Sequence, residues 1–338
     1  MAEEIKKVSC TEERVLFSGS AEHRYCAFPS IVPLDDTILC MFKLGDSHAG
    51  SAGCIAYLRF LRDGTVTDSG IAATPEEGKN DQNVEVLSFP DGSVRYYVDV
   101  QDAAPVGKRY GMFCGSVLTD GGKLAFPHDP AVVTDTDGTP YGYAFDGTAV
   151  PGGYLMLAMT FPELAGPDPE KTPVLLFSED GKRWRKRLKL NEAFDGNYNE
   201  SAICTIGDTV FLAVRGYEGT TVFAACDSDG TVRCFRRITR GSDGIDEIGR
   251  PSLFVRDGAL YCLCRVVAGR PMELRLLRLD PDTLAIREQH LLDQGTRDGY
   301  YAEGYMDGND FCVVTYKEHD GEDKPSIVLL RYPWDALR

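Results

Sequence analysis

Several residues of this chain could act together on a molecule that carries a carboxylate. Guanidinium groups bind a carboxylate bidentately, a carboxylate beside a tyrosine can accept the phenolic proton, and a separate carboxyl group can protonate a leaving oxygen. The candidates for binding are Arg24, His48, Arg215, Arg250 and Arg265, and the candidates for catalysis are Asp46, Glu200 and Tyr301. These residues are far apart in the sequence, so only the elements between them can bring them together.

The elements that would position them are β-hairpins. Six turns rich in Asp and Gly each separate two apolar runs, a pattern typical of antiparallel strand pairs. They lie at Asp35-Asp36, Asp91-Gly92, Gly152-Gly153, Gly207-Asp208, Asp257-Gly258 and Asp307-Gly308. The runs are almost continuously apolar, which favours inner strands covered on both faces.

A second set of turns alternates with the first. The fullest is Ser178-Glu179-Asp180-Gly181-Lys182-Arg183-Trp184, in which the aspartate can bond nearby N–H groups and the tryptophan can pack into the layer below. Weaker versions contain Asp63, Asp120, Asp229 and Asp282, at spacings of 57, 60, 49 and 53 residues along the series, and a last weak one is Glu322-Asp323-Lys324. Two hairpins per repeat predict an all-β fold, a six-bladed β-propeller with four-stranded antiparallel blades, over a single domain of residues 1–338. A β-sandwich with ordinary Asp-Gly turns is the alternative.

Hairpin register predicts which residues meet at the end opposite the turns. Residues equally distant from a turn lie side by side, which pairs Glu200 with Arg215 and Arg250 with Arg265. The same rule places Tyr300 or Tyr301 near Tyr316. One rim should therefore collect arginines, carboxylates and a tyrosine.

Composition narrows the partners. The chain has 338 residues, with 36 Lys and Arg against 52 Asp and Glu, a formal net charge of −16. This balance argues against nucleic acid or an anionic membrane as partner, although clustered arginines can still bind a small anion. The first residues show no signal-peptide pattern, and most of the 11 cysteines lie in apolar runs, so we expect a cytoplasmic chain with reduced thiols. A secreted mature form fits the same sequence.

The chain resembles the sialidase superfamily, in particular the bacterial BNR/Asp-box sialidase-like proteins, over nearly its whole length. The similarity rests on the Asp turns, on Asn199-Glu200-Ser201-Ala202-Ile203 up to Arg215, on Arg250-Pro251-Ser252-Leu253 up to Arg265, on Tyr301 up to Tyr316-Lys317-Glu318, and on Gly45-Asp46-Ser47-His48. It implies a retaining exo-glycosidase for a terminal acidic sugar, sialic acid first among them, that needs no metal or other cofactor. Tyr301 would be the nucleophile, assisted by Glu200, with Asp46 as acid/base and the arginines on the sugar carboxylate.

One position departs from the family. Sialidases usually begin with Arg-Ile-Pro, whereas the matching triplet here is Ala27-Phe28-Pro29, and Arg24 lies three residues earlier. Two alternatives therefore stay open, a hydrolase or lyase for uronate-containing glycans on the same scaffold and a glycan-binding propeller without catalysis. The expected partner in each case is a small carbohydrate or glycan terminus with a carboxylate.

Overall fold

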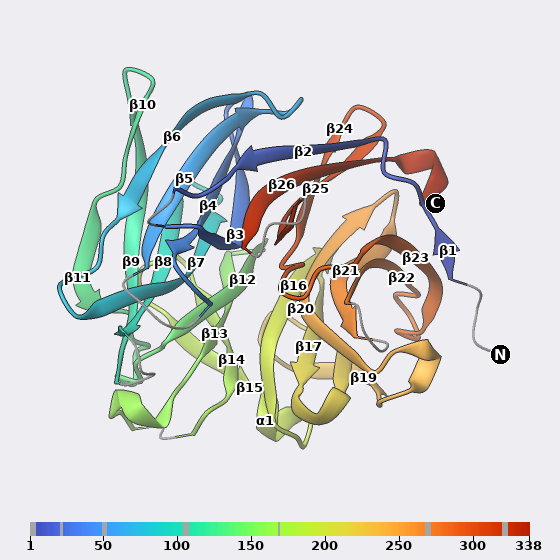
Figure 1. Ribbon diagram of the computed structural model, residues 1–338. Helices are drawn as coiled ribbons and strands as arrows, with labels where there is room; N and C mark the ends of the chain where they lie inside the picture. Colours follow the sequence, from blue (N-terminus) through green and yellow to red (C-terminus); the bar gives the residue numbers. More distant parts are fainter. Residues whose placement is uncertain are drawn as a thin grey trace.

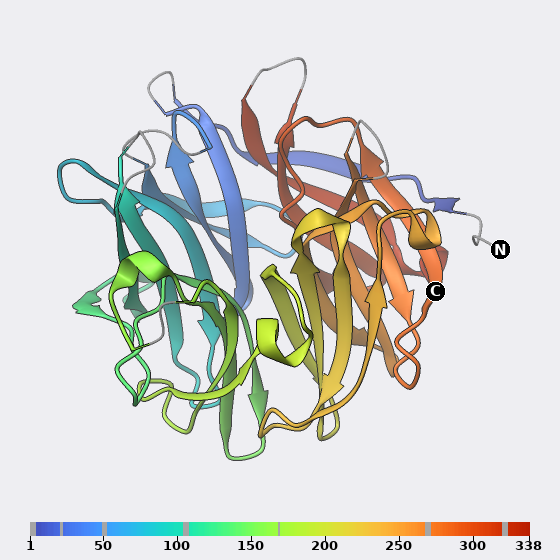
Figure 2. The same ribbon diagram turned by 90° about the horizontal axis from the view of Figure 1, so that it is seen from below.

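The structure is a computed structural model that describes residues 5–20, 23–48, 53–103, 108–167, 170–267, 272–319 and 324–338. Six small antiparallel sheets stand around a common axis and form a six-bladed β-propeller, as Figures 1 and 2 show. The fold class predicted from the sequence is confirmed.

The first three blades follow the chain in order. Blade one has the strands β3 Tyr25–Leu34, β4 Thr37–Gly45, β5 Cys54–Leu61 and β6 Val66–Ala73. Blade two has β7 Lys79–Ser88, β8 Val94–Asp102, β9 Arg109–Asp120 and β10 Lys123–Ala125, with β11 His128–Val132 also paired to β9. Blade three has β12 Tyr143–Val150, β13 Gly153–Met159, β14 Pro173–Ser178 and β15 Arg185–Lys189.

The last three blades bring the two ends of the chain together. Blade four has β16 Tyr198–Ile206, β17 Thr209–Gly216, β18 Thr221–Cys226 and β19 Val232–Ile238. Blade five has β20 Glu247–Arg256, β21 Ala259–Val267, β22 Glu273–Leu279 and β23 Ile286–Gln294, with β1 Lys6–Lys7 parallel to β23. Blade six has β24 Glu303–Asp307, β25 Asp310–Glu318 and β26 Pro325–Pro333, and its outer strand is β2 Glu12–Phe17 from the N-terminal end.

Helical structure is confined to short segments. They are α1 Leu190–Ala193 and the 3-10 turns η1 Pro162–Leu164, η2 Tyr217–Gly219, η3 Ser242–Gly244 and η4 Trp334–Ala336. No helix among the described residues is long and apolar enough to cross a membrane.

The six Asp/Gly turns join the first and second strands of the six blades, as expected. Asp35 and Asp257 both adopt φ 52°, the left-handed conformation that tight hairpins need. The second set of turns joins the third and fourth strands of blades one to five. Glu322-Asp323-Lys324 instead lies between β25 and β26, and Glu322 and Asp323 are outside the described residues.

The fullest turn has the local bonds that its sequence predicts. Asp180 Oδ1 accepts hydrogen bonds from the N–H groups of Lys182 and Arg183, each at 2.9 Å, and Trp184 is only 1% exposed. In blade five the accepting carboxylate is Asp280 rather than Asp282, because it receives the N–H groups of Asp282 and Thr283 at 3.0 and 2.8 Å. The prediction for that turn was therefore wrong by two residues.

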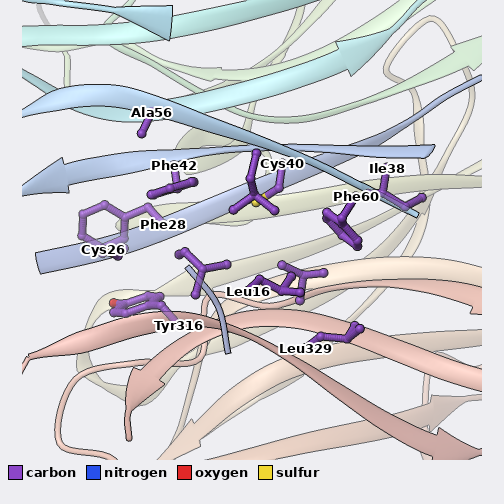
Figure 3. Packing of buried hydrophobic residues seen from close by; sticks show 14 of the residues in the cluster. Leu16, Cys26, Phe28, Ile38, Cys40, Phe42, Ala56, Phe60, Tyr316 and Leu329 are labelled. Atoms are coloured by element: carbon purple, nitrogen blue, oxygen red, sulfur yellow. The ribbon is translucent and has the colours of Figure 1, made fainter. Parts of the chain in front are cut away.

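The core consists of six apolar clusters, each between two neighbouring blades. The cluster between blades six and one closes the ring, and Figure 3 shows Leu16 of β2 packed among side chains of both blades. Apolar burial of this kind stabilises the structure in proportion to the area removed from water. Closure thus depends on the N-terminal strand as well as on the six repeats.

Leu16→Ala should lower the free energy of unfolding by about 2–5 kcal/mol, because it leaves a cavity in the cluster that joins the two ends of the ring. Leu16 is 7% exposed, whereas Leu118 on β9 is 51% exposed and provides the matched control Leu118→Ala. Urea denaturation followed by tryptophan fluorescence measures both. Equal stability of the two variants would show that β2 does not hold the ring closed.

Candidate active site

Tyr301 and Glu200 meet at the axis of the propeller. Tyr301 lies two residues before the start of β24, Glu200 lies on β16, and the tyrosine hydroxyl donates a hydrogen bond to Glu200 Oε1. The other carboxylate oxygen accepts hydrogen bonds from Arg215 Nη1 at 2.8 Å and from the backbone N–H of Arg250 at 2.9 Å. Three blades therefore converge on one carboxylate.

Local backbone irregularities direct these residues to the axis. The register shifts between Tyr198 and Ser201 in blade four and between Gly249 and Ser252 in blade five. Arg250 adopts φ 37° and Tyr300, just before the candidate nucleophile, φ 63°. Bulges of this kind bend a strand and redirect its side chains, and they are common next to active sites. Glu200 thus lies at a bulge rather than in a regular ladder.

The three arginines of blades four and five surround the tyrosine. The guanidinium carbons of Arg265 and Arg250 lie 5.4 and 5.6 Å from the centre of the Tyr301 ring. Arg215 contacts Glu247 as well as Glu200, and Arg250 Nη2 lies 2.5 Å from Glu85 Oε2. Two of the three guanidiniums therefore already face carboxylates of the chain itself.

The same arginines retain donors with no partner. Arg215 Nε and Arg250 Nη1 are buried and make no hydrogen bond to the part of the chain that the structure describes. A buried donor without a partner costs free energy, so each is a natural contact for an anionic ligand. Both residues line a cavity of about 250 Å³. Its lining comprises Phe28, His48, Gln82, Asn83, Tyr143, Phe145, Asn199, Glu200, Arg215, Arg250 and Tyr301.

The charges around the pair fix where its proton lies. Burial alone would raise the pKa of Glu200, but Arg215 and Arg265 outweigh it and hold that pKa at about 2. Burial and then the Glu200 charge raise the pKa of Tyr301 well above its ordinary value, and Arg265 opposes them. The proton therefore stays on the phenol, and Glu200 is a carboxylate.

Blade one differs from the sequence-based expectation. Arg24 is exposed, precedes β3 and is not among the residues that line the cavity, so the structure does not bring it together with Arg215 and Arg250 there. Phe28 lies at the register shift within β3, with φ 57°, and its ring centre lies 4.9 Å from that of Tyr301. An aromatic ring thus stands where the arginine of the family triplet was sought.

The segment after β4 places its two candidates differently. Asp46 is exposed, accepts a hydrogen bond from Ser47 Oγ at 3.1 Å and does not line the cavity. His48, two residues later, does line it. Arg265 is absent from the lining but lies against the Tyr301 ring, as described above.

Sequence reasoning overlooked the carboxylates that balance the arginines. Glu247 stands opposite Val267 in the hairpin that also pairs Gly249 with Arg265, so the register rule could have placed it at the rim. Asp298 lies in the loop before β24, where no pattern marks it. Among the described residues, no group of three or more His, Cys, Asp or Glu side chains is arranged to hold a metal ion.

Three acids lie beneath the cavity on the axis. Glu85, Asp146 and Glu303 come from β7, β12 and β24, and a second cavity of about 290 Å³ is lined by all three. Burial raises the pKa of Asp146 to about 6 and that of Glu303 to about 7, and it raises the pKa of Glu85 strongly despite the charge of Arg250. These acids share one guanidinium, so they cannot all ionise at low cost.

Comparisons with known proteins show the fold. No family model matches the chain, and no curated protein sequence matches it. A protein of unknown function from Dyadobacter fermentans superposes with a TM-score of 0.71 at 16% identity, over 97% of this chain and 100% of its own. Trypanosoma rangeli sialidase in complex with sialic acid gives 0.62 at 13% identity, over 96% of this chain and 59% of the sialidase chain. A mutant of NanB sialidase from Streptococcus pneumoniae superposes with a TM-score of 0.61 at 12% sequence identity, over 96% of this chain and 71% of the NanB chain.

Glu303→Gln should make the free energy of unfolding fall less as the pH rises. Glu303 has an ordinary pKa of 4.5 and a folded value of about 7, so between these values the folded chain holds a proton that the unfolded chain has lost. Stability contributed by this group therefore falls as pH rises through that window. Between about pH 5 and about pH 8, the free energy of unfolding of the variant should rise relative to that of the wild type by on the order of 1–3 kcal/mol.

Urea denaturation at both pH values measures this gain. Glu77→Gln, on an exposed loop, removes the same charge elsewhere and is the control. A stability difference between Glu303→Gln and the wild type that does not change with pH would contradict the assignment.

Proposed function

We propose that this chain is a retaining exo-glycosidase that removes a terminal acidic sugar from glycans, with sialic acid as its substrate. The observation that carries the proposal is the hydrogen bond from the Tyr301 hydroxyl to Glu200 inside a cavity that Arg215 and Arg250 also line. A tyrosine paired with a carboxylate is the nucleophile arrangement of sialidases among glycoside hydrolases. The similarity in fold to sialidases, one of them solved with sialic acid, supports the same reaction class.

The arginines give the site its preference for an acidic sugar. The sugar carboxylate would accept hydrogen bonds from the unpartnered donors of Arg215 and Arg250, with Arg265 adjacent. A neutral phenol approaches such a substrate without the repulsion that an attacking carboxylate would meet. This is the physical reason for a tyrosine at the anomeric carbon.

Substrate binding would also prepare Glu200 as a base. Arg215 and Arg265 hold its pKa at about 2, too low for efficient removal of a phenolic proton. A substrate carboxylate on Arg215 shares that guanidinium with Glu200, so the attraction that lowers the pKa of Glu200 weakens. The proton can then pass from Tyr301 to Glu200 as the phenol oxygen bonds to the anomeric carbon.

Phe28 favours one second candidate, a hydrolase or lyase for uronate-containing glycans on the same residues. The ring fills the place where a family arginine was sought and lies against Tyr301, so fewer guanidiniums are available to one carboxylate. A panel of acidic glycosides that includes sialosides and glucuronides separates the two substrates. Tight binding of a sialic acid analogue with no turnover of any glycoside would instead indicate a glycan-binding propeller.

Tyr301→Phe should lower kcat/KM for a fluorogenic sialoside by on the order of 10³-fold or more, because it removes the attacking oxygen and little else. Tyr57→Phe is the matched control, since its hydroxyl bonds Asp68 at the outer side of blade one. Mass spectrometry of the protein with a fluorinated sugar tests for the covalent adduct on Tyr301. Full activity of Tyr301→Phe would overturn the assignment of the nucleophile.

A further inference from the structure

His48 stands at the edge of the candidate active-site cavity on a firmly held segment. Its backbone oxygen accepts hydrogen bonds from Lys43 Nζ at 3.0 Å and Gln82 Nε2 at 2.6 Å. Its ring contacts Phe28 edge to face, with 5.0 Å between ring centres. The side chain is nevertheless 53% exposed, and it lines the cavity together with Tyr301. A substrate in that cavity can therefore reach the imidazole.

Asp298 orients the imidazole from the opposite side. Asp298 Oδ2 lies 3.2 Å from His48 Nδ1 and accepts the Tyr25 hydroxyl at 2.5 Å, while Oδ1 accepts the Tyr316 hydroxyl at 3.0 Å. Burial would raise the pKa of this carboxyl, but the bonds from His48 and the two tyrosines lower it below the ordinary value. Asp298 is thus a carboxylate surrounded by donors.

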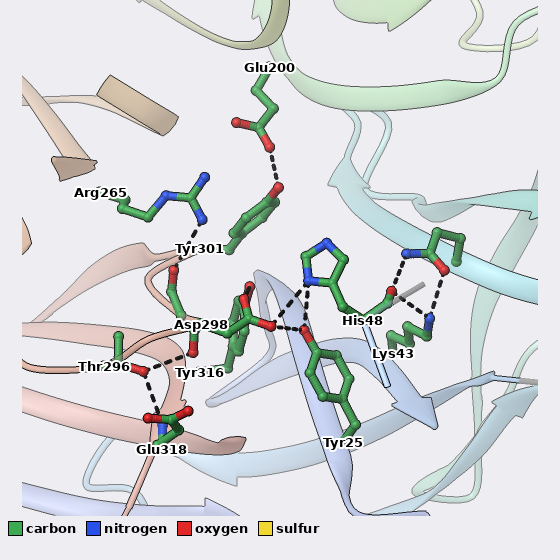
Figure 4. A network of polar contacts seen from close by, with 12 residues as sticks. Tyr25, Lys43, His48, Glu200, Arg265, Thr296, Asp298, Tyr301, Tyr316 and Glu318 are labelled. Atoms are coloured by element: carbon green, nitrogen blue, oxygen red, sulfur yellow. Dashed lines mark hydrogen bonds and ion pairs between the residues drawn. The ribbon is translucent and has the colours of Figure 1, made fainter. Parts of the chain in front are cut away.

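This network decides which ring nitrogen carries a proton. The Tyr25 hydroxyl gives its one proton to Asp298, so its oxygen can only accept from His48 Nδ1, 2.9 Å away. Nδ1 must therefore be the N–H that donates to both oxygens, and the other nitrogen, Nε2, is available for chemistry. Figure 4 shows this second nitrogen turned away from Asp298, toward the side where Tyr301 meets Glu200.

We propose that His48, positioned by Asp298, is the general acid/base of this site. This inference rests on the glycosidase function proposed above. Asp46, which the sequence favoured for the role, is exposed and outside the cavity lining, whereas His48 faces the cavity with a fixed tautomer. A carboxylate that fixes an imidazole and stabilises its protonated form is the arrangement in which histidine exchanges protons efficiently.

The protons balance over two steps. The first step begins with His48 as the imidazolium, protonated on both ring nitrogens. Tyr301 Oη bonds to the anomeric carbon and gives its proton to Glu200, while the glycosidic C–O bond breaks and His48 Nε2–H protonates the leaving oxygen. In the second, neutral Nε2 takes a proton from water, the water oxygen bonds to the anomeric carbon, and the bond to Tyr301 breaks. Glu200 then returns the proton to the phenolate, and His48 is again an imidazolium. Nothing is oxidised or reduced.

Leaving-group dependence tests the role of His48. His48→Gln should lower kcat by roughly 10²–10⁴-fold for a sialoside of an aliphatic alcohol, which needs a proton on departure. It should lower the rate of glycosylation far less for a sialoside of an acidic phenol, which departs without one. The matched control is His128→Gln, an exposed histidine on β11 in blade two that should keep wild-type rates on both substrates.

Asp298→Asn tests whether Asp298 positions the His48 ring. The pH profile of kcat/KM is the measurement, because a merely structural role of Asp298 would not shift it. The groups that face His48 are Tyr25 and Lys43 of blade one and Asp298 in the loop before β24. Across the cavity they are Tyr301, Glu200, Arg215 and Arg250. Loss of the carboxylate leaves the imidazolium with less stabilisation, so the alkaline limb of kcat/KM should shift to lower pH. Circular dichroism checks that each variant is folded.

The outcomes separate the two proposals. Two outcomes would overturn the role of His48 and leave the glycosidase function standing. In the first, Tyr301→Phe abolishes hydrolysis while His48→Gln slows the hydrolysis of both sialosides equally. In the second, Asp46→Asn alone slows the aliphatic sialoside selectively. If the wild type hydrolyses no acidic glycoside of the panel, the function falls, and the role of His48 in it falls too. Selective loss in His48→Gln with a shifted profile in Asp298→Asn supports the proposal.

Discussion

The open edges of the innermost strands are the constraint around which this propeller is built. Each first strand is paired on one side only, and its other edge turns toward the axis, where unpaired N–H groups would be costly. Side chains of the preceding blade bond several of them. Glu303 accepts Ile31 N–H, Ser30 accepts Val86 N–H, Asp146 accepts Ile203 N–H, and Glu200 accepts Arg250 N–H. The ring is thereby held along its axis as well as through its apolar interfaces.

The candidate active site uses one of these interblade hydrogen bonds. Glu200 makes the same interblade bond as Asp146 and Glu303, but it also accepts hydrogen bonds from an arginine side chain and a phenol. The surrounding charges give the carboxylates opposite behaviour. Guanidiniums keep the pKa of Glu200 at about 2, whereas burial keeps those of Asp146 and Glu303 at about 6 and 7. Acids at the same kind of interblade position can therefore hold the blades together or take part in catalysis, depending on the charges beside them.

Acidic side chains of the chain compete with an anionic ligand for the arginines of the cavity. Arg215 and Arg250 are shared with Glu200, Glu247 and Glu85, so a ligand would have to compete for part of their charge. Removing both partners of a buried ion pair from water is expensive, and leaving one alone is more so. Glu200 and Glu247 balance the charge of Arg215, and Glu85 bonds Arg250, while both arginines line the cavity and each keeps one unpartnered donor.

The order of the blades and part of the site follow from patterns within the chain. Alternating turns and apolar runs predict six hairpin pairs, and counting from Asp208 brings Glu200 beside Arg215, because hairpin register is local. Counting from Asp257 predicts Arg250 opposite Arg265, whereas the structure pairs Gly249 with Arg265 and leaves Arg250 in the bulge. Only the tertiary structure decided what meets across the axis. Asp298 reaches His48, Glu85 reaches Arg250, and Phe28 rather than Arg24 stands beside Tyr301. Those contacts join different blades through bulges and loops, whose directions are set when the ring closes and not by any spacing within one hairpin.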